Sequence, residues 1–225
     1  MAKITYEQCL YEEYLYLLSR NGLAVATDVA ALGQVLAELS AAVDEVCQGR
    51  DMACQEGCPH CCVLNVSVLM PEAAVIAAWL AERLSVEELA AMVTRLDHQQ
   101  KFVLWMDDGE RIHRKIVCPF LDKAGSCTIH PVRPLVCRGV TSLDSDLCRQ
   151  ALDSSEIEPS CSVPSDMLRR ALVDEAFCSF ARALEHCGME TRSIELSAGV
   201  LAFLQHPDLG AKLLRGERIL PEQLY

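Results

Sequence analysis

Four cysteines lie within the nine residues CQEGCPHCC at positions 54–62, and two of them are adjacent. Packing alone does not account for this density, because alanine or valine would fill the same space in a core. Gly57 and Pro59 flank Cys58 and favour the tight turn that lets a C-x-x-C step bend onto one ion. This segment is therefore predicted to be irregular and to bind a metal.

The adjacent pair, Cys61 and Cys62, restricts how these thiols can be used. Successive side chains point in different directions in most backbone conformations, so two neighbours rarely bind one ion together. Either one of the pair is a ligand while the other packs, or each of them faces a different metal.

A second group of cysteines lies in a stretch that cannot form a long helix. Residues 116–137 contain Gly125 and prolines at 119, 131 and 134, which interrupt helices. We expect irregular backbone with a small hairpin over 122–127, and then a short helix over 144–152. Eight thiolates suit two closed tetrahedral sites or one or two iron–sulfur clusters. The candidate ligands are Cys54, Cys58, Cys61, Cys62, Cys118, Cys127, Cys137 and Cys148.

The start of the chain and its cysteine content point to one compartment. Glu7, Glu12 and Glu13 interrupt the stretch that a secretory signal would need apolar, and no apolar run approaches the roughly 18 residues that cross a bilayer. We therefore expect a cytoplasmic protein without a membrane partner. In a reducing compartment the thirteen cysteines are not expected to form structural disulfides, which leaves metal ligation for any cluster.

The excess of acidic over basic residues limits which partners the protein can bind. The chain has 20 basic and 32 acidic residues, a net charge of -12. Such a surface repels phosphate backbones, so no nucleic-acid partner is expected. Arg111, Arg114 and Lys115 are the nearest approach to a basic patch. A protein partner for the acidic surface is left open.

Helical periodicity surrounds the cysteine-rich stretches. Apolar residues recur at helical spacing over 5–19 and 27–48. Asn21-Gly22 is expected to end the first helix and Gly49 the second. The remaining predicted elements are a short strand or extended segment at 63–69, helices at 71–83, 85–100, 165–186, 193–205 and 207–215, and a loop at 153–164. Ser85 and Glu88 form a capping box for the helix from 85, whose continuation to 107 is left open, and Asp108-Gly109 is expected to be a break.

The expected architecture is all-α or α-dominated, with helices around an irregular cysteine-rich core and little sheet. Trp79 and Trp105 fall on helix faces and are expected to be core residues. The predicted organisation is a single domain over 1–225, with an N-terminal helical pair (5–48), the cysteine-cluster core (54–148) and C-terminal helices (165–215).

Two arginines and two histidines lie inside the cysteine motifs. Arg133 and Arg138 are candidate cofactor-binding residues, because a guanidinium can hydrogen-bond sulfur or offset the charge of several thiolates. Pairing with surface acids is the alternative. His60 and His130 are either ligands or solvent-facing neighbours of the site, and the role of Cys161 in the following loop is left open.

These motifs resemble the YkgJ-type cysteine-cluster family, described as a zinc- or iron-chelating domain with a CxxCxxCC signature and eight shared cysteines. The resemblance covers residues 54–148, and its most specific part is the G-x-C-x-I-x-x-x-R-P-x-x-C-R run at 125–138. The chain departs from the family in its C-x-x-x-C step, Cys54 to Cys58, and in His130, where the family often has tyrosine. Some members resemble flagellin lysine methylases and are described as iron–sulfur proteins, so the resemblance implies a metal site and only weakly a reaction.

The predicted function is metal binding, with an iron–sulfur cluster as the leading cofactor and zinc as the close alternative. Two other interpretations are a cluster-dependent enzyme, either an oxidoreductase or a methylase-like modifier, and a structural zinc protein with an interaction role. The sequence contains no nucleophile elbow, phosphate loop, H-E-x-x-H or dinucleotide fingerprint, so no catalytic residue is assigned.

Overall fold

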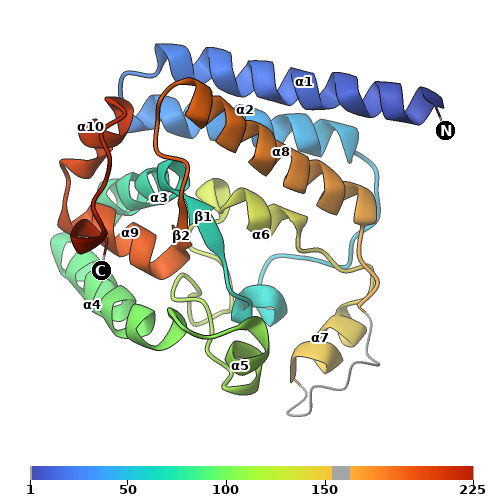
Figure 1. Ribbon diagram of the computed structural model, residues 1–225. Coiled ribbons are helices and arrows are strands. Elements are labelled where there is room, and N and C mark those ends of the chain that lie inside the picture. Colours follow the sequence, from blue (N-terminus) through green and yellow to red (C-terminus); the bar gives the residue numbers. More distant parts are fainter. Residues whose placement is uncertain (1, 154–162, 225) are drawn as a thin grey trace.

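The computed structural model describes residues 2–153 and 163–224, and its regular structure is almost entirely helical (Figure 1). The expected α-dominated architecture is confirmed. The longer helices are α1 (Ala2–Val25), α2 (Val29–Val46), α3 (Met70–Arg83), α4 (Val86–Val103), α8 (Met167–His186) and α9 (Leu196–Gln205). The shorter elements are α5 (Asp108–His113), α6 (Leu135–Gly139), α7 (Ser145–Asp153), α10 (Leu209–Leu214), the 3-10 turns η1 (His60–Val63), η2 (His130–Val132) and η3 (Pro221–Gln223), and the strands β1 (Ser67–Leu69) and β2 (Ser193–Glu195).

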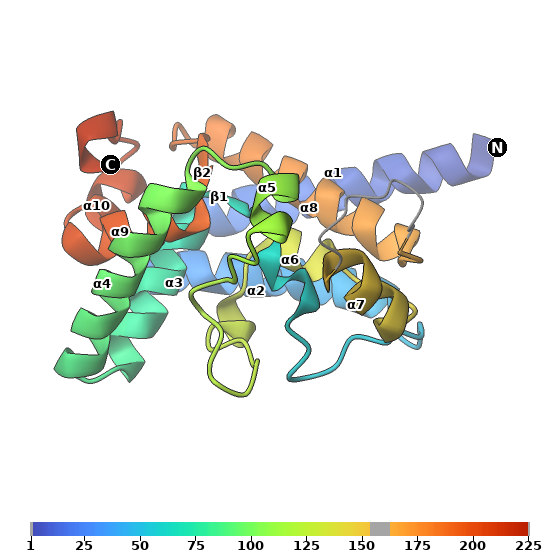
Figure 2. The same cartoon turned by 90° about the horizontal axis from the view of Figure 1, so that it is seen from below.

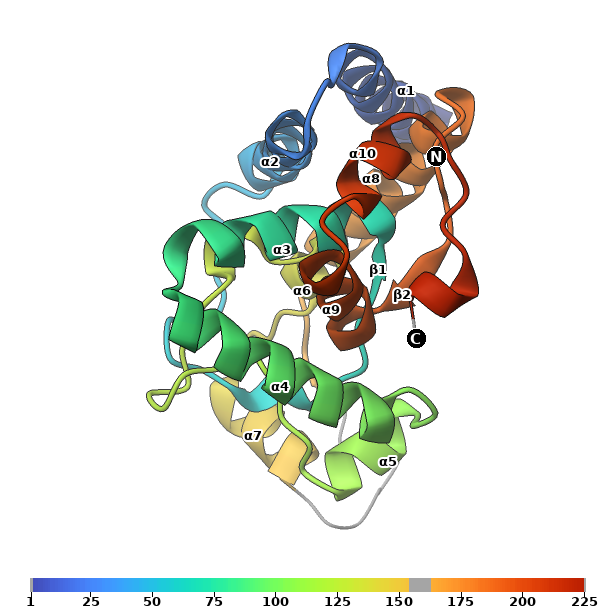
Figure 3. The ribbon, with the colours of Figure 1, turned by 90° about the vertical axis from the view of Figure 1, so that its left-hand side faces the viewer.

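Two groups of helices form the body of the molecule. α1, α2 and α8 run side by side (Figure 1), and α9 lies between α3 and α4 (Figure 3). Leu15 on α1, Leu39 on α2 and Phe180 on α8 are fully buried, and burying a side chain of this size contributes roughly 1.5–3 kcal/mol. Packing between helices therefore stabilises the body. No helix in the described part of the chain combines the length and apolar character that a bilayer crossing requires.

α1 extends beyond its predicted end. The sequence predicts a stop at Asn21-Gly22, but the helix continues to Val25, so that prediction is wrong. A Cβ on Gly22 would lie 2.5 Å from a methyl group of Val35 on α2. Gly22 therefore permits the two helices to approach closely. Gly49, with a φ of +76°, follows α2 where a helix stop was expected.

A two-stranded antiparallel sheet connects the chain before α3 with the chain before α9. β1 pairs with β2, and Val68 lies opposite Ile194. The strand expected within 63–69 is confirmed. The helix expected from residue 193 begins only at Leu196, because residues 193–195 are engaged in pairing with β1.

The break expected at Asp108-Gly109 is the start of a new helix, α5. Asp107 is its N-cap and accepts a hydrogen bond from the backbone N–H of Glu110 over 2.8 Å. The Glu110 carboxylate accepts the N–H of Asp107 in return, so the pair forms a capping box. The chain therefore turns after α4 and becomes helical again.

The two tryptophans differ in their surroundings. Trp79 packs against the core, and the guanidinium of Arg83 lies 3.2 Å from the centre of its ring. Trp105 follows the end of α4 and is 86% exposed, so the prediction that it is a core residue is wrong. The helical pattern ends just before it, which is why the periodicity did not apply.

The segment between α5 and α7 is largely irregular, as expected. The predicted hairpin is confirmed, because Leu121 and Cys127 form an antiparallel bridge. The carboxylate of Asp122 accepts hydrogen bonds from the backbone of Ala124 and Ser126 inside the turn. α7 confirms the short helix expected near Cys148. Most of the loop expected at 153–164, with its Cys161, lies outside the described residues.

Candidate metal centre

The eight candidate cysteines lie on separate pieces of chain that meet beside η1. Cys61 and Cys62 belong to η1, and α7, which carries Cys148, packs against this turn. The backbone N–H of Cys118 donates to the carbonyl oxygen of Cys62 over 2.6 Å. Figures 1 and 2 show η1 between α7 and the segment that follows α5. The two cysteine-rich stretches are therefore neighbours in the fold.

Two glycines allow the first cysteine loop to touch the hairpin of the second. Gly57 and Gly125 both have a φ of +81°, a conformation that glycine adopts without a steric penalty. A Cβ on Gly125 would lie 3.1 Å from the carbonyl oxygen of Gly57 and 3.6 Å from the ring of Pro59. A larger residue at position 125 would thus push the two loops apart.

One neighbourhood of thiols contains Cys54, Cys58, Cys61 and Cys148. Burial, and then the charges of Cys61, Cys58 and Cys54, raise the pKa of the Cys148 thiol to about 11. The backbone N–H of Ser142 lies 3.3 Å from the sulfur of Cys54. The chain between α6 and α7 therefore holds Cys54 at the edge of this group.

A second neighbourhood contains Cys62, Cys118, Cys127 and Cys137. Burial, with the nearby Cys127 adding to it, raises the pKa of Cys118 to about 12. The pKa of Cys137 is also raised, by burial first and then by the charges of Cys118 and Cys61. These thiols are protonated at neutral pH, so a bound metal would have to displace their protons.

The adjacent pair lies between the two neighbourhoods. The Cys62 thiol donates a hydrogen bond to the sulfur of Cys61, which lowers the pKa of Cys61 and raises the pKa of Cys62. Cys61 interacts electrostatically with Cys148 and also with Cys127 and Cys137. Cys62 interacts with Cys118 and Cys127. Cys61 therefore lies near thiols of both neighbourhoods, and the adjacent pair is the point at which the two neighbourhoods meet.

Positive charge lies among the thiols. After the hydrogen bond from Cys62, the charge of Arg133 contributes to the lowered pKa of Cys61. The Nε of Arg133 is buried and has no hydrogen-bond partner among the described residues. An unsatisfied buried donor costs about 1–3 kcal/mol. An anionic partner beside Arg133, such as a thiolate, would remove this cost.

Arg138 fixes the turn that carries Arg133. Its Nη2 donates to the carbonyl oxygen of Pro131 over 3.1 Å, and its Nε donates to that of Arg133 over 3.4 Å. Burial, and then the charges of Arg133 and Arg138, lower the pKa of His130, so this exposed imidazole is neutral at neutral pH. His60 lies half-buried in η1, and the roles of both histidines stay predictions.

Glu72 is a buried acid that sequence reasoning missed. Its carboxylate is in α3, is 2% exposed, and accepts hydrogen bonds from the backbone N–H groups of Leu69 and Leu135, each over 2.8 Å. Burial raises the pKa of Glu72 to about 7. Because Leu135 begins α6, Glu72 anchors the helix that carries Cys137. Its place three residues after Leu69 signals a cap for α3, but the contact to α6 depends on the tertiary fold.

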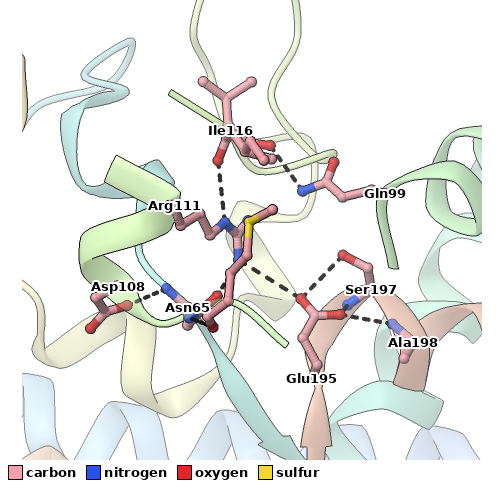
Figure 4. A network of polar contacts seen from close by, with 10 residues as sticks. Asn65, Gln99, Asp108, Arg111, Ile116, Glu195, Ser197 and Ala198 are labelled. Atoms are coloured by element: carbon pink, nitrogen blue, oxygen red, sulfur yellow. Dashed lines mark hydrogen bonds and ion pairs between the residues drawn. The ribbon is translucent and has the colours of Figure 1, made fainter. Parts of the chain in front are cut away.

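A second buried polar network, around Arg111, was also missed (Figure 4). Arg111 is 2% exposed, so its charge does not add to Arg114 and Lys115 on the surface. Its side chain contacts Asn65 and Glu195.

The thiols fit a thiophilic metal in kind and number, although their side chains do not converge. Among the described residues, no three histidine, cysteine or acidic side chains are arranged to hold a metal ion as they stand. Soft thiolate ligands select zinc and iron–sulfur clusters, and the unpartnered Nε of Arg133 provides for negative charge. Metal binding would therefore require the clustered thiols to lose their protons and turn toward common centres.

Comparison with known proteins supports the same chemistry. Residues 53–162 match the family model CxxCxxCC, described as a "putative zinc- or iron-chelating domain". The resemblance predicted from the cysteine motifs is confirmed over this part of the chain, which is similar to that domain. No curated protein and no solved structure matches the chain.

Proposed function

We propose that this protein binds iron–sulfur clusters, with zinc as the alternative cofactor, through eight thiolates arranged in two sets of four. The observation that supports this proposal is the meeting of two thiol neighbourhoods at the adjacent pair Cys61 and Cys62. The first set is Cys54, Cys58, Cys61 and Cys148. The second set is Cys62, Cys118, Cys127 and Cys137.

The division between the sets follows the neighbours of each thiol. Cys148 interacts with Cys54, Cys58 and Cys61, and these four residues complete one tetrahedral set. Cys62 interacts with Cys118 and Cys127. Cys61 also interacts with Cys127 and Cys137, so we assign it to the first set because four ligands complete a tetrahedral centre with Cys148. The hydrogen bond between Cys61 and Cys62 is lost when both become ligands, which frees the two side chains to turn apart.

Arg133 and Arg138 would bind the second set from outside. Four thiolates around one centre leave it with a net negative charge, which nearby guanidinium groups offset. Arg133 has a buried Nε without a partner among the described residues, so it is the group that would donate to a ligand sulfur. Arg138 would hold the backbone of Arg133 in place through the carbonyl contacts it already makes.

Two chemistries fit this donor set. An iron–sulfur cluster would supply a one-electron redox centre, whereas zinc would supply a redox-silent crosslink between the loops. The chain's own contribution is the same in both cases. It brings thiols from distant segments together, limits solvent around them and places positive charge beside them.

The test is metal analysis with absorption spectroscopy on anaerobically purified protein. Iron with absorption near about 400 nm supports clusters, and colourless protein with zinc supports the alternative. Cys148→Ser and Cys127→Ser should each lower the metal content by about half, because each removes a ligand from a different set. Cys178→Ser, at an exposed cysteine on α8, is the control and should leave it unchanged. Full metal content in both variants, or no iron or zinc in the wild type, would contradict the proposal.

A further inference from the structure

A charged residue, Arg111, is buried beside the proposed centre and joins three distant segments (Figure 4). Its Nε donates to the carbonyl oxygen of Ile116 over 3.2 Å, and its Nη1 donates to Oδ1 of Asn65 over 3.2 Å. The same Nη1 lies 3.8 Å from Oε1 of Glu195. The planar guanidinium suits such a junction because it presents several donors in fixed directions.

The contact with Ile116 sets the path of the chain into Cys118. After α5, Lys115 has a φ of +52°, a left-handed conformation that costs a non-glycine residue about 1–3 kcal/mol. The N–H of Ile116 donates to the carbonyl oxygen of Arg111 over 3.1 Å. Arg111 and Ile116 are therefore bonded twice, once through the backbone and once through the side chain. This double contact fixes the direction of the two residues that precede the thiol.

The contact with Asn65 fixes the chain that leaves Cys62. The N–H of Asn65 donates to the carboxylate of Asp108 over 2.6 Å, and its side-chain amide donates to the carbonyl oxygen of Met106. Its Oδ1 is the acceptor for Arg111. Asn65 is thus held at three points, two on α5 and one in the turn before it.

Glu195 ties the junction to the helical body. Its carboxylate caps α9 by accepting the N–H groups of Ser197 and Ala198 over 2.7 and 3.0 Å. It is also the residue of β2 that lies opposite Ser67 of β1. Through Glu195, Arg111 therefore connects both cysteine segments to β2 and to the start of α9, which are fixed in the helical body.

We propose that Arg111 is a positioning residue for the second thiol set: it holds the Cys62 and Cys118 segments side by side, so that both thiols can turn toward one centre. The direct hydrogen bond from the N–H of Cys118 to the carbonyl oxygen of Cys62 lies between the two segments that Arg111 clamps. This inference rests on the proposed function. It adds a residue outside the cysteine motifs on which the geometry of the set depends.

The test compares anaerobically purified full-length variants by residue-resolved thiol alkylation and metal content. Arg111→Gln removes the charged guanidinium that contacts Ile116, Asn65 and Glu195. Arg111→Lys keeps the positive charge but loses the several fixed donors of the guanidinium. In both variants, alkylation of Cys62 and Cys118 should be at least about tenfold faster than in the wild type, since a loss of 1.4 kcal/mol in local stability gives a factor of ten. Cys148 should stay protected. Of the contacts that Arg111 makes, Asn65→Ala removes only the one with Asn65, and it should show the same pattern more weakly. This variant replaces the arginine variants if they fail to fold.

The matched control is Arg169→Gln. Arg169 is also buried and ion-paired, with Asp44 at 2.6 Å, but on α8. It should lower the melting temperature without selective exposure of Cys62 and Cys118. Equal alkylation rates in the Arg111 variants and this control, or exposure of both sets alike, would overturn the inference alone. A wild type without iron or zinc would overturn the proposed function and this inference with it.

Discussion

The helical body and the cysteine-rich region are stabilised by different means. In the body, side chains such as Leu15, Leu39 and Phe180 are fully buried between helices, and burial of apolar surface dominates folding free energy. In the cysteine-rich region, residues 54–66 and 116–148, the buried apolar residues are Val63, Phe120, Ile129 and Leu135. Such a short set supplies much less apolar burial for a stretch of irregular backbone.

Polar side chains from the body compensate for part of this difference. Arg95 and Gln99 of α4 donate to the carbonyl oxygens of Pro119 and Val117 over 3.0 and 2.9 Å. Arg111 and Glu72 make equivalent contacts with the same region. Irregular backbone needs partners for its N–H and C=O groups, and here the helices supply them. The cysteine-rich region is therefore held against the helical body mainly by polar contacts, and these contacts position its thiols.

The largest effect is expected from a core substitution in the body. Phe180→Ala should lower the free energy of unfolding by about 4 kcal/mol, because Phe→Ala changes in cores cost 3–5 kcal/mol. Urea denaturation followed by circular dichroism measures it. The metal content per folded molecule should not change. A loss below about 1 kcal/mol would mean that the body is not held by this packing.

A second prediction concerns the boundary between the two regions, at Glu72. Its pKa is raised from 4.5 to about 7 in the folded protein, so the folded state binds more protons than the unfolded state between these values. Stability should therefore fall as pH rises through this window, by about 3 kcal/mol in total. Glu72→Gln removes the titration and should flatten this part of the stability curve, although it loses one acceptor.

The measurement is the pH dependence of unfolding for the wild type minus that for Glu72→Gln between pH 4 and 8. The subtraction removes the contributions of other titrating groups. Parallel curves would show that Glu72 is ionised in the folded state with an ordinary pKa, and that the contact with α6 is not made in a buried environment.

Gly22→Ala sharpens the account of the body. The new Cβ would overlap the Val35 methyl group at 2.5 Å, and overpacking of this kind costs about 1–3 kcal/mol against a helix-propensity gain of about 1 kcal/mol. We expect a net loss of about 1 kcal/mol. Gly33→Ala in α2, whose Cβ would lie 3.3 Å from Val75, is the control and should be close to neutral. Equal effects would argue against the close α1–α2 contact.

The smallest effect is expected at the exposed tryptophan. Trp105 is 86% exposed, so Trp105→Ala should change the free energy of unfolding by less than about 0.5 kcal/mol. Trp79→Ala should cost clearly more, since Trp79 packs against the core and Arg83. Thermal unfolding of the two variants under the same conditions measures the difference between their losses of stability. A large loss at Trp105 would place part of the core in the turn after α4.

Local sequence signals predicted most of the body. The apolar spacing over 27–48 and the Ser85 capping box both correspond to observed helices, because these signals act within a few residues. Gly22 was misread because a glycine inside a helix serves either a left-handed stop or a close approach, and only the neighbour Val35 distinguishes them. Residues 193–195 were misread as helix because their pairing partner, β1, is far away in the sequence.

For the candidate centre, the sequence indicated which stretches would be irregular but not how they are arranged. Cysteine spacing and the prolines identified two irregular stretches, and the structure brings them together beside η1. Which thiol neighbours which was beyond sequence reasoning, because it depends on α7 folding back onto η1. Arg111 and Glu72 were missed for the same reason: their partners Asn65 and Leu135 lie far from them in the chain.

The central claim is that thiolates from the two cysteine-rich stretches bind metal together. X-ray absorption spectroscopy at the iron and zinc edges of the anaerobically purified full-length protein tests it most directly. The account predicts a first shell of sulfur at about 2.3 Å from the metal, with about four sulfur ligands per centre. A first shell of nitrogen and oxygen, or a protein that carries neither iron nor zinc, would contradict it.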